Sequence, residues 1–171
     1  MQSNKVAFHR QGVVSALAVA LGLTFIPTAF AGTTDTQTVT YEVQAINEIG
    51  VSGNPGALTI STATAGSAPD SVSDASTTWA VTTNESTKKI TAAINTAMPT
   101  GLTLTVNLGA PTGGTSAGAV TLGSTAADVV TSISTLNESS LGVTYQLSAT
   151  SAAGVVASAN KTVTFTIADG A

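Results

Sequence analysis

The chain contains no cysteine, and its one histidine and one arginine, His9 and Arg10, lie close to its start. Residues 32–171 therefore cannot pair a serine or cysteine nucleophile with a histidine. The same absence excludes the usual zinc sites and any disulfide. A carboxylate pair could still hydrolyse a glycoside, but nine acidic residues scattered along the chain give no reason to expect one. We predict no catalytic residue and no cofactor, and that the protein is not an enzyme.

Two carboxylates in a polar stretch, Asp70 and Asp74, are the strongest candidates for binding a cation. Calcium takes about six to eight oxygen ligands, and two carboxylates supply too few of them. The simpler interpretation is a solvated loop, and we predict no metal site.

Charge is scarce and mostly of one sign. Charged residues make up 8% of the chain, against about a quarter in an ordinary soluble domain. All nine acidic residues but only three lysines, Lys88, Lys89 and Lys161, follow residue 31, which gives that part a net charge of −6. A negative surface repels nucleic acid and anionic membranes, so neither is an expected partner.

The first 31 residues have the three-part pattern of a secretory signal peptide. Lys5 and Arg10 form a basic region, residues 12–26 are an apolar run of 15, and Ala29-Phe30-Ala31 is a small-x-small cleavage site. The alternative is a membrane anchor, but a span needs about 20 apolar residues. We predict cleavage after Ala31, secretion to the cell exterior, and a mature chain of 140 residues that forms one domain.

Threonine and serine take the place of charge, supplying 45 of those 140 residues. Threonine favours strands and leaves a surface that forms hydrogen bonds without charge. Monomeric sheet proteins commonly protect their edges with charged side chains, which this chain can hardly do. Such a surface suits a subunit packed against copies of itself; compositional drift in an exported domain is the other explanation.

Short runs of alternating apolar and polar residues predict a series of β-strands. The predicted strands are 57–61, 77–83, 88–94, 102–108, 120–122, 143–149 and 162–167. The second and third of these are predicted to form a hairpin. Residues 47–56, which contain glycine and proline, are predicted to be a connector, and residues 62–76 a polar loop.

One segment, residues 124–133, predicts a short helix. Ser124 is a suitable N-cap, and Val129, Val130 and Ile133 follow at helical spacing. With one short helix among many short strands, the fold class is all-β: a single antiparallel β-sandwich of Ig-like or jelly-roll type.

The stretch TQTVTYEVQAI, residues 36–46, predicts a further strand at the start of the mature chain. Val39, Tyr41, Val43 and Ala45 share its apolar face. The strand either packs in its own sandwich or is donated to the sheet of a neighbouring subunit. Donation repeated head to tail builds a filament. The expected organisation is a signal peptide at 1–31, a candidate donor strand at 32–50 and the sandwich at 51–171.

A signal peptide, an alternating strand straight after cleavage and a small Thr/Ala/Val-rich sandwich together resemble exported filament subunits that assemble by donor-strand exchange. Camelysin-like biofilm-matrix fibre proteins and the pilins of archaeal bundling pili are such subunits. The resemblance implies that residues 33–46 are the donor strand and that the partner is another copy of the chain. The apolar face would then fill an acceptor groove through Val39, Tyr41, Val43 and Ala45. The chain lacks the cysteine pair of many chaperone–usher subunits and the long hydrophobic N-terminal helix of type IV pilins.

These features predict a structural subunit of a pilus or biofilm-matrix fibre, which could also attach to surfaces or other cells. The alternative is a secreted monomeric Ig-like adhesin or binding module, with Trp79 or Tyr145 exposed beside a loop. The chain has three glycosylation sequons, little more than the number expected by chance in a chain this rich in serine and threonine. They matter only in a host that glycosylates exported proteins. They begin at Asn84, Asn137 and Asn160.

Overall fold

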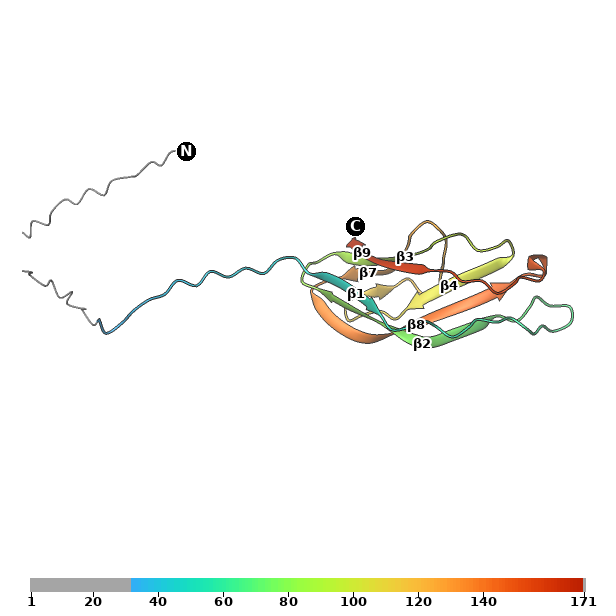
Figure 1. Ribbon diagram of the computed structural model, residues 1–171, viewed down its shortest axis with the longest axis horizontal. Helices are drawn as coiled ribbons and strands as arrows, with labels where there is room; N and C mark the ends of the chain where they lie inside the picture. Colours follow the sequence, from blue (N-terminus) through green and yellow to red (C-terminus); the bar gives the residue numbers. More distant parts are fainter. Residues whose placement is uncertain (1–31, 171) are drawn as a thin grey trace, which may run out of the picture. The chain divides into compact units, whose positions relative to one another are not determined.

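The computed structural model describes residues 32–170, so the predicted signal peptide lies outside the described residues. Its strands are β1 (Asn47–Val51), β2 (Val72–Thr83), β3 (Lys88–Ile94), β4 (Leu102–Leu108), β5 (Thr115–Ser116), β6 (Val120–Thr121), β7 (Ala127–Ile133), β8 (Leu136–Ala149) and β9 (Val163–Asp169) (Figure 1). A single 3-10 turn, Ser151–Ala153, is the only helix within the described range. The chain divides at Glu42, where the folded unit begins, and residues 32–41 form a separate unit.

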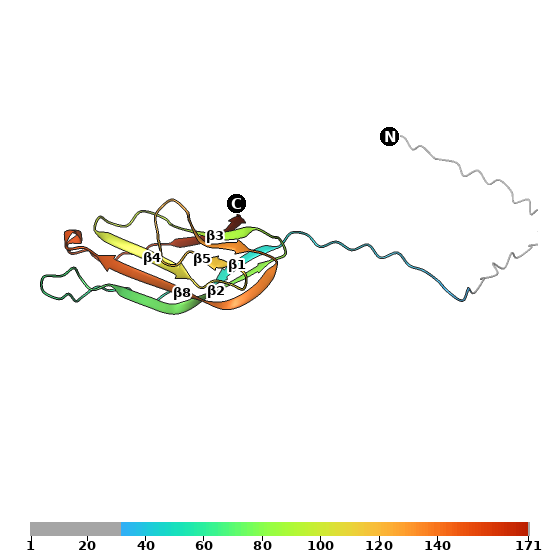
Figure 2. The ribbon, with the colours of Figure 1, turned by 180° about the vertical axis from the view of Figure 1, so that it is seen from behind.

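The strands form two sheets. A five-stranded sheet has the order β1-β2-β8-β4-β6, and a four-stranded sheet has the order β5-β7-β3-β9. Every pairing is antiparallel. The two sheets pack face to face, as the front and back views show (Figures 1 and 2). The predicted all-β fold with antiparallel sheets is confirmed.

The core lies between the two sheets. Trp79 of β2 is 1% exposed, and its indole Nε1 donates a hydrogen bond of 3.1 Å to the carbonyl of Gly109. A buried tryptophan usually needs such a partner for its N–H. Other fully buried side chains come from both sheets: Ile90, Val106, Leu108, Val129, Val130, Ile133 and Val143. Because the core joins strands distant in sequence, neither sheet is expected to be stable alone.

The helix predicted at residues 124–133 is wrong, because most of that segment, Ala127–Ile133, is strand β7. The ladder between β3 and β7 shifts register twice, on either side of Ile90. Such β-bulges insert an extra residue and break the alternation of a strand. Val129 and Val130 are consequently both buried although they are adjacent. The bulged strand thereby acquires the apolar spacing of a helix.

Two predictions of strand and connector are also wrong. Residues 47–51, predicted as a connector, form β1, which pairs with β2 from Asn47 opposite Thr83 to Val51 opposite Trp79. Residues 57–61, predicted as a strand, belong to no ladder. The predicted hairpin of β2 and β3 does not form either, because the chain crosses from one sheet to the other between them.

Candidate assembly interface

The predicted donor strand forms no ladder within the described chain, since residues 33–46 belong to no strand or helix. We call residues 33–43 the arm. Three apolar side chains of the arm are strongly exposed: Val39 by 77%, Tyr41 by 90% and Val43 by 78%. Burial of one such side chain is worth about 1.5–3 kcal/mol. The arm therefore offers a row of side chains whose burial would be strongly favourable.

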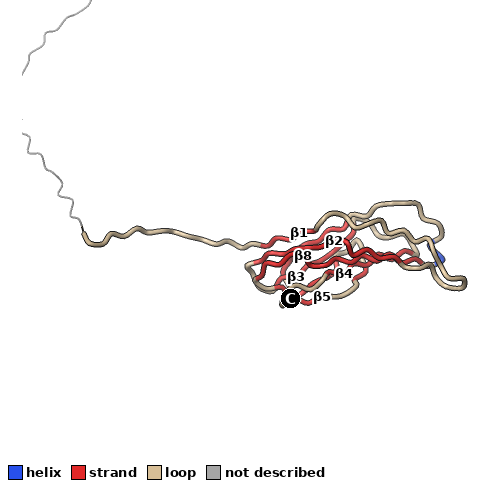
Figure 3. Tube along the Cα trace, turned by 90° about the horizontal axis from the view of Figure 1, so that it is seen from below, coloured by secondary structure: helices blue, strands red, loops and turns tan. Residues whose placement is uncertain are grey.

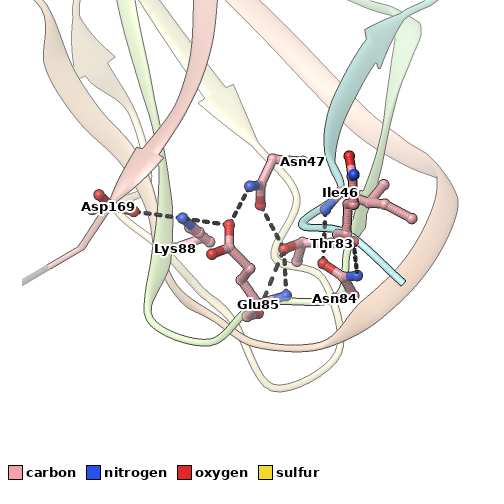
Figure 4. Close-up of polar contacts among 8 residues, drawn as sticks. Ile46, Asn47, Thr83, Asn84, Glu85, Lys88 and Asp169 are labelled. Carbon is pink, nitrogen blue, oxygen red and sulfur yellow. Dashed lines mark hydrogen bonds and ion pairs between the residues drawn. The ribbon is translucent and has the colours of Figure 1, made fainter. Parts of the chain in front are cut away.

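The arm ends where Asn84 binds the chain. The Asn84 side-chain Nδ2 donates to the carbonyl of Gln44 at 2.7 Å, and its Oδ1 accepts from the amide of Ile46 at 2.8 Å (Figure 4). The backbone amide of Asn84 also donates to the carbonyl of Ile46 at 3.2 Å. Ala45, the fourth predicted interface residue, lies between the two bound residues and is exposed. The structure thus places Ala45 in a fixed base and leaves the other three in the arm.

A polar cluster behind this base joins β1, β3 and β9 at the same end of the sandwich (Figure 4). The ammonium group of Lys88 lies 2.8 Å from the carboxylate of Glu85 and also pairs with Asp169. Glu85 accepts a further hydrogen bond from the side-chain Nδ2 of Asn47. The hydrogen bonds to Asp169 and then to Glu85 raise the pKa of Lys88. The bond from Lys88 lowers the pKa of both carboxyls. This cluster links residues of both sheets at the arm's base.

Strand β9 has a free edge. It pairs with β3 along its whole length, from Asp169 opposite Lys88 to Val163 opposite Ile94. Among the residues that the structure describes, nothing pairs with its other edge. The strand VTFTIAD has no proline and no charge before Asp169, and charge or proline is what usually protects such an edge. Its inward side chains, including Phe165, are only half-buried. A further strand could pair here.

A groove runs beside this edge. It consists of two adjoining cavities of about 620 and 790 Å³ that share Leu58, Met98 and Leu147. Its floor follows alternate residues of β8 from Val143 to Ala149. At about 3.3 Å per strand residue, that floor is about 20 Å long. Val163 and Phe165 line one wall, and residues 51–59 line the other.

The wall opposite β9 continues into residues 57–61. The side chains of Leu58 and Ile60 are half-buried, and those of the alternate residues 57, 59 and 61 are exposed, which is the pattern of a strand. Yet within the described range the amides and carbonyls of residues 57–61 make no hydrogen bond. Backbone groups in folded proteins are nearly always paired, with protein or with water. Both flanks of the groove therefore carry backbone groups free to pair with another chain.

One buried hydroxyl in the groove lacks a partner. Thr77 of β2 lines the smaller cavity and is 6% exposed, and its Oγ1 makes no hydrogen bond to any described residue. Leaving such a group unpaired costs about 1–3 kcal/mol. Nothing in the sequence distinguished Thr77 from the other threonines.

The structure leaves the other candidate residues in ordinary settings. Trp79 and Tyr145 are buried, so the exposed aromatic expected of the adhesin alternative is not found at either. Asp74 accepts hydrogen bonds from the hydroxyl and amide of Ser76, and these lower its pKa. No group of three or more potential metal ligands occurs within residues 32–170. In the same range, no helix is long and apolar enough to cross a membrane.

The comparisons with known proteins assign no family. No protein-family model matches the chain, and no curated protein matches its sequence.

Proposed function

We propose that the protein is a secreted structural subunit of an extracellular filament, a pilus or biofilm-matrix fibre, which polymerises head to tail through its arm. The observation that carries this proposal is the exposed face formed by Val39, Tyr41 and Val43. Three alternate apolar side chains in one exposed segment resemble a core strand that lacks its sheet. Addition of such a strand to another subunit's sheet would bury them and pair their backbone.

The positions of the arm's base and of the groove support an open assembly. Asn84, which binds the base, directly follows the last residue of β2. The groove is lined at its other end by residues from the loop 58–63, before β2, and from the loop 150–161, after β8. These two loops lie together at the end of the sandwich where β2 begins (Figure 1), and the 3-10 turn of the second loop is the blue segment in Figure 3. The twelve residues of β2 span about 36 Å. Donor and acceptor at opposite ends give a head-to-tail contact, which builds an open filament when the rotation between subunits does not close a ring.

The test compares Tyr41→Asp with the matched control Thr40→Asp in the mature chain, residues 32–171. Both variants add one negative charge to the arm, but only the first adds it to the apolar face. We expect filaments from the parent chain and the control, and none from Tyr41→Asp, because an unpaired carboxylate would be buried at the contact. Negative-stain electron microscopy gives the readout. Monodisperse particles from the parent chain would contradict the proposal and favour the secreted adhesin.

A further inference from the structure

We propose that the groove between β9 and residues 57–61 is the acceptor site, and that its occupant is the arm of a second copy of this chain. The inference rests on the proposed function and goes beyond it by naming the surface that receives the arm. Added as a strand, the arm would pair with the free edge of β9 on one side. On its other side it would meet the unpaired backbone of residues 57–61, which would then become a strand.

The length and period of the groove fit the arm. Val143, Tyr145, Leu147 and Ala149 of the floor alternate along one strand, so their side chains recur about every 7 Å. Val39, Tyr41 and Val43 recur at the same interval if the arm is extended. Seven residues of the arm, 37–43, would cover the floor of about 20 Å. Apolar side chains that line both cavities, Leu58, Met98 and Leu147, suit these side chains.

The unpaired hydroxyl of Thr77 points to a missing occupant. It lies in the groove, it is almost fully buried, and no described residue satisfies it. Buried hydroxyls in native structures usually have a partner. Tyr41 is the one side chain on the apolar face of the arm that carries a polar group. A tyrosine that enters the groove brings a phenol hydroxyl able to donate or accept a hydrogen bond.

The other edges are less suited to the arm. The part of β2 that extends past β1 is covered by its own chain: the amide of Ser52 donates to the carbonyl of Thr78 at 2.8 Å. Beyond that bond, a Cβ on Gly56 would lie 2.9 Å from the carboxylate Oδ2 of Asp74. The remaining edge strands are β1, with five residues, and β5 and β6, with two each. All three are shorter than the seven residues of the arm that would pair.

The absence of cysteine makes disulfide crosslinking a direct test. Thr164 of β9 is exposed, and opposite residues on neighbouring strands lie within the Cα separation that a disulfide accepts. Thr164→Cys is combined in turn with Thr38→Cys, Thr40→Cys and Glu42→Cys. The control combines the same three arm positions with Thr115→Cys on β5, the opposite edge of the same sheet. Electron microscopy establishes which variants form filaments.

We expect a ladder of disulfide-linked dimers, trimers and higher species on a non-reducing gel for at least one pair with Thr164, and none for the pairs with Thr115. Filaments that crosslink only through Thr115, or through neither, would overturn the acceptor site and leave the proposed function standing. A disulfide confined to the monomer would show that the arm fills its own groove, which also overturns the inference. If the parent chain forms no filaments, the proposed function itself fails.

A second measurement needs no cysteine in the chain. Hydrogen exchange compares filaments of the parent chain with the unassembled Tyr41→Asp variant. The amides of residues 57–61 are expected to exchange at least about tenfold more slowly in the filament, because they would gain strand hydrogen bonds. The amides of residues 115–116 in β5 serve as the internal control. Equal exchange at 57–61 in both states would refute insertion of the arm beside this segment.

Discussion

The substitution Thr77→Val should have opposite effects on the free subunit and on the filament. Valine has nearly the shape of threonine but no hydroxyl. In the free subunit the hydroxyl is buried and unpaired, so its removal relieves a cost of about 1–3 kcal/mol. A stabilisation of 1 kcal/mol corresponds to an increase of about 4 °C in Tm for a domain of this size. In the filament the hydroxyl would be bonded to the arm, and its removal would then cost about 1 kcal/mol per interface.

The assay compares Thr77→Val with the parent in two backgrounds. The Tyr41→Asp chain provides the unassembled subunit, and its thermal unfolding should shift upward by about 4 °C or more. Filaments of Thr77→Val should dissociate at a lower denaturant concentration than those of the parent. Thr105→Val, at a half-buried position on the outward face of β4, is the control and should change neither midpoint by a comparable amount. Destabilisation of the free subunit by Thr77→Val would show that the hydroxyl already has a partner there and would refute the reasoning.

Two further predictions concern the stability of the subunit. Lys88 lowers the pKa of Glu85 and of Asp169 below their ordinary values of 4.5 and 3.8. The stability that these two carboxylates contribute is therefore present above about pH 5 and is lost as the pH falls through their folded pKa values. Denaturant titrations should show a smaller loss of unfolding free energy on acidification for Lys88→Met than for the parent, and an equal loss would contradict the role of this cluster. Gly101 has a φ of +83°, and a Cβ there would lie 2.7 Å from the amide nitrogen of Ala153, so Gly101→Ala should lower the free energy of unfolding by about 1–3 kcal/mol. A Cβ on Gly123 would lie no closer than 4.0 Å to its nearest neighbour, the amide nitrogen of Thr125. Gly123→Ala should therefore cost less unfolding free energy in the same denaturant titration, and equal costs for the two variants would refute the argument.

The alternation of the sequence predicted the strands that lie in regular ladders. Residues 88–94 and 102–108 were predicted with the bounds that β3 and β4 have, and β9 differs by one or two residues. The alternation failed to predict the structure of segments whose conformation depends on whether another strand lies beside them. Asn47–Val51 is a strand because β2 lies beside it, and residues 57–61 are not, because no strand does. Bulges opposite β3 account for the helix that was wrongly predicted over β7.

The arm and the groove, the two halves of the candidate site, also differ in how far the sequence could predict them. The apolar face of the arm follows from local alternation, and Val39, Tyr41 and Val43 could be named from the sequence. The groove, the free edge of β9 and the unpaired hydroxyl of Thr77 could not. They depend on which side of the two sheets is left open, and that is decided by the order of strands in each sheet.

The separation of the arm's base from the groove has a mechanical consequence. Asn84 binds the chain at one end of β2, and the groove extends toward the other. In the proposed filament, tension along the fibre would pull each arm lengthwise against β9. Ladder hydrogen bonds of antiparallel strands are perpendicular to the strands, so this force would load all of them together in shear, instead of peeling them apart one by one. The fibre would then resist stretching without a single covalent crosslink.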